Sequence, residues 1–137
     1  MQANAVLAKL FPGLELEGDT EGDKVLSPYN KEPLPAGTFL NTHPVVFGIT
    51  ASLYEGVTIC YPKNLPSDFN VLARSTDNHE AIFCRDKKPG SSFGRTLVDV
   101  GFTKHFCSWN AAGNGRYIIN ANTWLIGEEI ANDTYFV

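Results

Sequence analysis

The sequence of 137 residues has the length of one domain, and its apolar fraction of 43% is enough for a single core without disulfide bonds or bound metal ions. The charged fraction of 19% and the net charge of −4 argue against a disordered chain and against a dedicated nucleic-acid binder, which would carry a basic surplus. Cys60, Cys84 and Cys107 are odd in number and widely spaced, so we expect free thiols in a reducing compartment; one disulfide with one free thiol is the alternative.

The first predicted element is a short amphipathic helix over residues 3–11, ended by Pro12 and Gly13. A helix this short must dock on other structure to be stable. We expect it to pack on its own domain, and the alternative is an arm that docks on a neighbouring subunit. Lys9 interrupts this early apolar run, so we expect no secretory signal, and the apolar runs are too short to span a bilayer. The candidate interface residues of the helix are Leu7, Leu10 and Phe11.

Acidic residues then occupy every second position from Glu15 to Asp23, with Gly18 and Gly22 among them. We interpret this segment as a solvated, self-repelling acidic loop. Two alternatives stay open, a hard cation such as calcium or a basic patch on a partner. The spacing of an EF-hand is absent.

The stretch Val45–Tyr61 predicts a central hairpin, because two runs of β-branched and aromatic residues flank Glu55 and Gly56. Short strands are also expected within residues 24–29 and 38–40. His43 precedes Pro44 and is expected in extended backbone at the surface.

Further strands are expected over residues 69–73, 81–85 and 96–109. On the last of these strands, His105 and Cys107 lie on the same face, with their Cα atoms about 6.5 Å apart. This is near the reach that an imidazole needs to activate a thiol. Asp99 shares this face but is too distant along one strand to orient His105. A zinc site would have to recruit distant ligands, so we expect no metal site. Its further ligands would be Cys60, Cys84, His43 and His79.

Residues 116–126 alternate in polarity and predict a long strand that ends at Gly127. Asparagine is disfavoured in strands, so two of them beside an indole suggest a surface that binds sugar rings or the backbone of a partner. An ordinary solvent-facing side is the alternative. The candidate interface or ligand residues of this strand are Tyr117, Asn120, Asn122 and Trp124.

The succession of short strands and close turns, with one helix and no βαβ alternation, predicts a mainly β fold. We expect one domain over residues 1–137, an antiparallel sandwich or barrel of about seven to nine strands. Residues 1–24 would form the helix and the acidic arm that lead into its core.

Two neighbouring segments carry a resemblance to a known family. Residues 31–40 read Lys-Glu-Pro-Leu-Pro-Ala-Gly-Thr-Phe-Leu, and residues 44–51 read Pro-Val-Val-Phe-Gly-Ile-Thr-Ala. They resemble small head-decoration proteins of tailed phages, in which an Ala-Gly-Thr-x-Leu turn precedes a Val-Gly-Ile-x-Ala strand in a small β-rich core. Here Phe47 separates the valine from the glycine, and the N-terminal helix replaces the extended arm of that family. The resemblance implies monomers or trimers that cover a capsid lattice and stabilise the shell, with no catalytic residue.

The sequence therefore favours a non-enzymatic structural protein of a virion, a capsid decoration or cement protein without a cofactor. Its expected partners are capsid or other assembly subunits and further copies of itself, with neither nucleic acid nor membrane among them. The expected location is the virion, or otherwise the cytoplasm. One alternative is a small-ligand or glycan-binding β domain that uses Asn120, Asn122 and Trp124, and another is a small thiol-dependent enzyme that uses His105 and Cys107.

Overall fold

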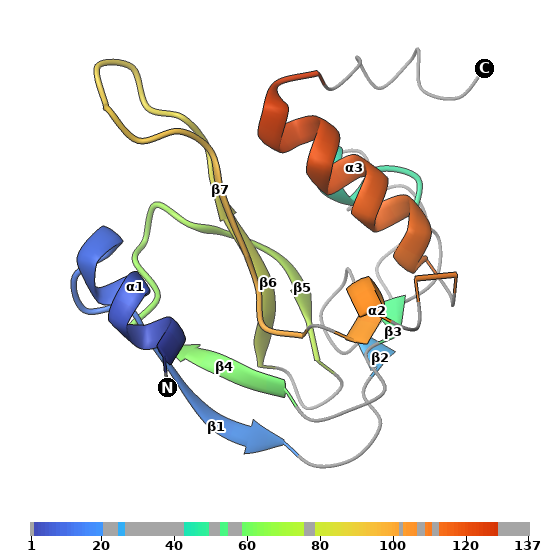
Figure 1. Ribbon diagram of the computed structural model, residues 1–137, viewed down its shortest axis with the longest axis horizontal. Coiled ribbons are helices and arrows are strands. Elements are labelled where there is room, and N and C mark those ends of the chain that lie inside the picture. Colours follow the sequence, from blue (N-terminus) through green and yellow to red (C-terminus); the bar gives the residue numbers. More distant parts are fainter. Residues whose placement is uncertain are drawn as a thin grey trace.

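Seven β-strands and three α-helices form the described part of this computed structural model (Figure 1). It describes residues 2–20, 25–26, 43–49, 53–54, 59–75, 79–101, 103–106, 109–110 and 113–128. The strands are β1 (Glu15–Thr20), β2 (Val25–Leu26), β3 (Leu53–Tyr54), β4 (Ile59–Lys63), β5 (Asn70–Arg74), β6 (Glu80–Arg85) and β7 (Thr96–Asp99). The helices are α1 (Gln2–Leu10), α2 (Thr103–Phe106) and α3 (Asn114–Ile126), with a 3₁₀ turn η1 (Pro44–Val46).

The strands pair into three small antiparallel sheets, β1–β4, β2–β3 and β5–β6–β7. The prediction of a mainly β, antiparallel fold is confirmed at this level. The three-stranded sheet lies between α1 on one side and α3 on the other (Figure 1). Its middle strand alternates accordingly, because Phe83 joins the core cluster of α1 while Ile82 and Cys84 join the cluster of α3.

The predicted N-terminal helix is present as α1, and it docks on its own domain. Leu7 and Phe11 are buried in a core cluster with Leu14 and Leu16, so these two interface candidates are core residues. Asn4 fixes the helix to β1, since its side chain both donates to the Leu16 carbonyl at 2.9 Å and accepts from the Leu16 amide at 2.8 Å. Leu10, the third candidate, is 41% exposed.

The predicted acidic loop is wrong over residues 15–20, which form strand β1. Acidic residues occur at every second position because they lie on the outer face of this strand: Glu15 is exposed, while Leu16 between the acidic residues is buried. Glu17 pairs with Lys63 of β4 at 3.4 Å. Gly18 has a φ of +75° at an irregularity in the register, as in a β-bulge. Glu21 to Asp23 lie outside the described residues.

The predicted central hairpin is also wrong. Its first run begins in η1, where Val45 and Val46 are fully buried, and its second run is β4. β3 pairs with β2 and β4 pairs with β1, so the described parts of the two runs have different partners. A short run of buried apolar residues fits a strand and a buried turn equally well.

The chain around the three-stranded sheet is predicted in part. The strands expected at 69–73 and 81–85 are confirmed as β5 and β6. The strand expected at 96–109 is correct only as far as Asp99, where β7 ends. The chain then turns at Gly101 into the short helix α2.

The strand predicted at 116–126 is wrong, because this segment is the helix α3. Its buried side chains recur at helical spacing and pack against η1 and the three-stranded sheet. Gly127 ends it as expected, in left-handed backbone with its amide bonded to the Trp124 carbonyl. The buried residues of α3 are Asn114, Tyr117, Asn120, Ala121 and Trp124.

The strand expected at 38–40 lies outside the described residues. Among the described helices, none combines the length and apolarity that a membrane crossing needs.

Candidate functional site

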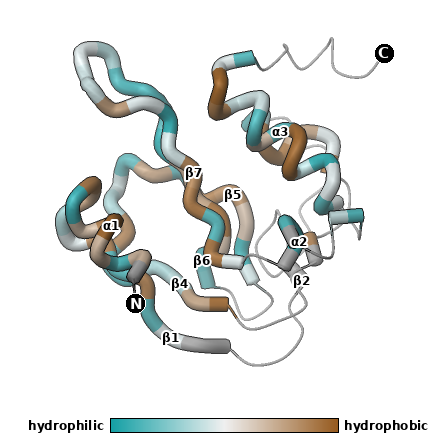
Figure 2. The backbone as a smooth tube through the Cα atoms, viewed as in Figure 1, coloured by the Kyte–Doolittle hydropathy of each residue, from teal (hydrophilic) through white to brown (hydrophobic). Residues whose placement is uncertain are grey.

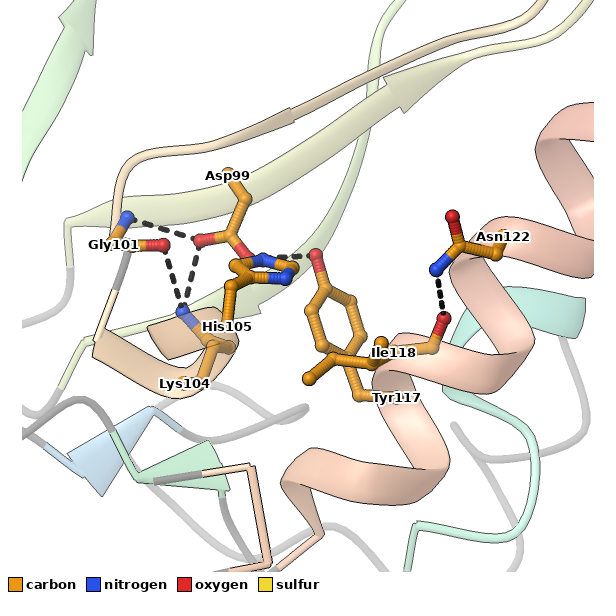
Figure 3. Close-up of polar contacts among 7 residues, drawn as sticks. All are labelled: Asp99, Gly101, Lys104, His105, Tyr117, Ile118 and Asn122. Carbon is orange, nitrogen blue, oxygen red and sulfur yellow. Dashed lines mark hydrogen bonds and ion pairs between the residues drawn. The ribbon is translucent and has the colours of Figure 1, made fainter. Parts of the chain in front are cut away.

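One buried carboxylate at the end of β7, that of Asp99, gathers donors from the turn that follows β7, from α2 and from α3 (Figure 3). Oδ1 of Asp99 accepts from the Gly101 amide at 3.0 Å and from Nζ of Lys104 at 2.9 Å. Oδ2 accepts from the Tyr117 hydroxyl at 2.7 Å and lies 3.4 Å from Nε2 of His105. We call Asp99, Lys104, His105 and Tyr117 the Asp99 cluster.

The charges of this cluster compensate one another inside the protein. The Lys104 side chain is fully buried and that of Asp99 is 11% exposed, so neither charge is well solvated. Burial by itself would raise the pKa of Asp99, but the His105 hydrogen bond, the Lys104 ammonium and the Tyr117 hydroxyl outweigh it and hold this pKa below its ordinary value. Lys104 also donates to the Gly101 carbonyl at 3.3 Å. Asp99 and Lys104 therefore form a satisfied buried ion pair that connects α2 to β7, and the Tyr117 hydroxyl connects α3 to the same carboxylate.

The neighbourhood of His105 differs from the sequence prediction. Because the chain turns after β7, Asp99 reaches His105 although six residues separate them. The imidazole of His105 is 46% exposed. Its predicted partner Cys107 lies outside the described residues. Within the described ranges, no three His, Cys, Asp or Glu side chains are grouped to hold a metal ion.

A second histidine and cysteine meet in the core beneath α3. Sγ of Cys84 lies 3.4 Å from Nε2 of His43, and the His43 ring packs edge-on to Trp124 at 5.1 Å between centroids. Burial, with a smaller effect of Asp86, raises the pKa of the Cys84 thiol to about 12. A thiol with such a pKa stays protonated and is a poor nucleophile. His43 has the extended backbone that its position before proline predicts, and its Nδ1 accepts from the Val45 amide at 3.3 Å.

Most of the predicted ligand face is buried. Tyr117, Asn120 and Trp124 are at most 1% exposed, and only Asn122 is at the surface, where it stands apart from the Asp99 cluster (Figure 3). On a helix, residues two apart point about 200° away from each other, so Asn120 and Asn122 lie on opposite sides. Asn120 donates to the carbonyls of Phe47 at 2.8 Å and Val45 at 3.3 Å, which fixes α3 to η1.

Two further contacts hold α3 rigidly. Arg95 donates to the Trp124 carbonyl at 2.6 Å, where α3 ends, and its guanidinium lies 5.0 Å from the Trp124 ring. A cation at the C-terminus of a helix is favourable, because the last carbonyls lack partners within the helix. Arg95 also pairs with Asp86 at 3.1 Å. α3 is thus fixed at its start by Tyr117, at its middle by Asn120 and at its end by Arg95.

The outward side of α3 is apolar as well. Ile119, Leu125 and Ile126 are 53%, 41% and 72% exposed, and Figure 2 shows a hydrophobic last turn that hydrophilic positions separate from the hydrophobic middle of the helix. Trp109, 58% exposed, lies against Gly115, where a Cβ would be 3.6 Å from its ring and 3.1 Å from its carbonyl oxygen. We call this surface the outer stripe of α3; it consists of Trp109, Ile119, Asn122, Leu125 and Ile126.

The outer stripe carries no charged side chain. The only charged residue within α3 is Arg116, whose guanidinium lies beside Gly48, 3.0 Å from where a Cβ there would stand. A solvent-facing helix normally shows charged residues opposite its buried face, and a helix that is apolar all round is normally buried. When residues 116–126 are interpreted as a strand, the uncharged outer side of the segment is not recognised. When they are interpreted as a helix, the apolar residues at 119, 125 and 126 point to it.

Comparison of the chain with protein-family models, with curated proteins and with solved structures gives no match. Its function is therefore inferred from the geometry of the Asp99 cluster and the outer stripe.

Proposed function

We propose that this chain is a non-enzymatic structural protein of a virion, a capsid decoration protein that binds across coat subunits and stabilises the assembled shell. The observation that carries the proposal is the outer stripe, an apolar and uncharged surface on a firmly held helix. Exposed apolar surfaces of this kind mark sites of protein interaction. The resemblance of residues 31–51 to head-decoration proteins supports the choice of a capsid as the partner.

The rigid mounting of α3 suits such a role. A surface that is already ordered before binding loses little conformational entropy when it binds. Contacts from Tyr117, Asn120 and Arg95 order α3 in the free chain. A protein that binds only the assembled shell stabilises it by mass action, by about 2.7 kcal/mol per site when the free concentration is 100 times Kd.

We also propose that the three small sheets are parts of one antiparallel sandwich or barrel, and that the chain occupies the shell as a monomer or a homo-oligomer. The side chains of Asn120 and Trp124 are buried, so they are not accessible to a glycan at the surface.

The proposal is tested by co-sedimentation of the purified chain with shells assembled from the coat protein of the genome that carries it. We expect saturable binding to shells, no binding to unassembled coat protein, and a higher temperature of shell disruption when the chain is bound. Equal binding to assembled and unassembled coat protein, or no binding to either, would contradict the proposal.

A further inference from the structure

The side chain of Arg85, the last residue of β6, makes no hydrogen bond to any other residue that the structure describes. It shares a face of β6 with Phe83, towards α1, and is 13% exposed. The Asp68 carboxylate lies 3.7 Å from its Nη1, beyond the range of a hydrogen bond, and its Nε is buried without a partner. A guanidinium carries five N–H donors, so the donor capacity of Arg85 is unused within the described residues.

Three phenylalanine rings hold this guanidinium in place. Its Cζ lies 4.6 Å from the ring centroid of Phe11, 5.4 Å from that of Phe93 and 5.9 Å from that of Phe69. A cation at such distances from aromatic rings is attracted to them. Phe11 and Phe69 are buried and in edge contact with each other, whereas Phe93 is 45% exposed. The guanidinium is therefore positioned by apolar rings rather than by hydrogen-bond acceptors.

The outer end of this guanidinium reaches the surface beside a second cation. Of its nitrogens only Nε is buried without a partner, so the Nη end is the part that solvent reaches. Lys88, 57% exposed, lies 2.6 Å from the same Asp68 carboxylate. Two cations and one carboxylate leave a positive charge on a chain whose total is −4. We propose that the Nη end of Arg85 binds a carboxylate whose apolar or aromatic neighbour rests against Phe93.

The charge and shape of the site favour a carboxylate over a phosphate. The two Nη groups lie in one plane and match the two oxygens of a carboxylate, and the rings fix that plane. A carboxylate brings one negative charge, which balances the site, whereas a phosphate brings more charge next to Asp68. The exposed Phe93 ring adds an apolar contact. Such a carboxylate belongs either to a small aromatic acid or to an acidic side chain of a peptide.

The carboxylate site is separate from the surface that carries the proposed function. Phe11 and Phe69 belong to the core cluster of α1, while the outer stripe lies on α3, on the other side of the three-stranded sheet (Figure 1). Shell binding and carboxylate binding are therefore able to fail independently.

The Nε–Hε resonance of Arg85 reports on the site directly by NMR. The ¹⁵N-labelled chain is titrated at constant ionic strength with sodium benzoate, with benzamide as the uncharged control and sodium phosphate as the more highly charged one. We expect benzoate to shift this resonance saturably, with a Kd in the millimolar range, and both controls to bind at least about 5-fold more weakly. No saturable shift with benzoate, or an equal affinity for either control, would overturn the inference.

A second titration identifies the source of the carboxylate. Its probe is a short peptide, capped at both ends, with one glutamate between two leucines. Tighter binding of the peptide than of benzoate supports an acidic side chain of a protein, and tighter binding of benzoate supports a small aromatic acid. Peptide binding that is unchanged when its glutamate is replaced by glutamine would overturn the carboxylate as the recognised group.

Matched variants separate the guanidinium from general charge, with the Phe93 amide as the common readout. Arg85→Lys keeps the charge but loses the planar fork, so benzoate binding should weaken at least about 5-fold. Lys87→Gln removes an exposed charge from the same connection and should bind as the wild type does. Equal losses in these two variants would overturn the inference.

The exposed ring gives a variant that does not disturb the core. Phe93→Ala should fold, because the ring is 45% exposed, and should weaken benzoate binding at least about 3-fold while leaving acetate binding unchanged. Its readout is the Arg85 Nε–Hε resonance, so this test holds even where Arg85→Lys does not fold. Unchanged benzoate binding in Phe93→Ala would overturn the aromatic contact.

Discussion

Asp99 is the residue on which three elements depend. It receives donors from its own turn, from α2 and from α3, and its carboxylate neutralises the buried ammonium of Lys104. The sequence shows each of these residues but not their meeting, because the turn at Gly101 and the helical form of residues 103–106 decide it. A strand through this segment would have kept Asp99 away from His105.

Replacement of this carboxylate measures the ion pair. Asp99→Asn leaves the fully buried Lys104 ammonium without its counter-charge, so we expect a loss of about 3–5 kcal/mol in the free energy of unfolding at pH 7. Asp86→Asn is the matched control, because Asp86 is an exposed partner of Arg95 and should cost less than about 1 kcal/mol. Urea denaturation gives both values. A similar small cost for both variants would show that the cluster contributes little.

The same pair predicts a pH dependence. Folding lowers the pKa of Asp99 from its ordinary value of 3.8, so its stabilising contribution is present above that pH and is lost as the pH falls through the lowered pKa of the folded state. The difference in stability between wild type and Asp99→Asn should therefore narrow as the pH falls below 3.8. Urea denaturation across this range is the measurement. A difference that is unchanged at pH 2.5–3 would assign the cost to something other than the charge.

Asn120 and Asn122 give a second matched comparison. Asn120→Ala removes the donor of the Val45 and Phe47 carbonyls in the core, and we expect a loss of about 1–3 kcal/mol. Asn122 is exposed and its side chain donates to the Ile118 carbonyl of its own helix, so Asn122→Ala should change stability by less than about 0.5 kcal/mol. Equal effects in thermal unfolding would contradict the placement of these two side chains.

At the scale of elements, α3 shows where sequence reasoning fails. Ile118, Ile119 and Thr123 favour a strand locally, and alternation over this segment satisfies a period of two. The spacing of Tyr117, Ala121 and Trp124 satisfies helical periodicity as well, and tertiary packing selects the helix. α1 had no such competition, because its apolar residues fit only the helical period and Pro12 and Gly13 mark its end.

Gly18 in strand β1 and Gly90 in the β6–β7 connection give a comparison of glycine replacements. An added Cβ at Gly18 would meet Cε1 of Tyr61, whose ring stacks on His79 at 4.0 Å, whereas a Cβ at Gly90 would meet nothing within 4 Å. Both glycines have positive φ, of 75° and 77°. Gly90→Ala should therefore cost about 1–2 kcal/mol from backbone strain alone, and Gly18→Ala about 1–3 kcal/mol more. Equal costs in urea denaturation would show that Tyr61 moves aside freely.

At the scale of the molecule, the antiparallel β class follows from the sequence while the pairing does not. Strands β5 and β6 are predicted nearly to the residue, because turns and β-branched residues delimit them. The partners of β3 and β4 are long-range pairings, which no local pattern specifies. The candidate site was predicted in part only. The apolar residues Ile119, Leu125 and Ile126 can be read from the sequence, but their exposure on one helix follows only from the structure of α3.

We propose that the outer stripe of α3 makes the contact by which this chain joins an assembly. The most direct test compares Ile126→Asp with Ser92→Asp in the shell co-sedimentation assay, since both add one carboxylate at an exposed position. We expect Ile126→Asp to weaken shell binding at least about 10-fold, equivalent to about 1.4 kcal/mol, and Ser92→Asp to bind as the wild type does. Binding of Ile126→Asp at the wild-type level, with the fold intact by circular dichroism, would contradict the claim.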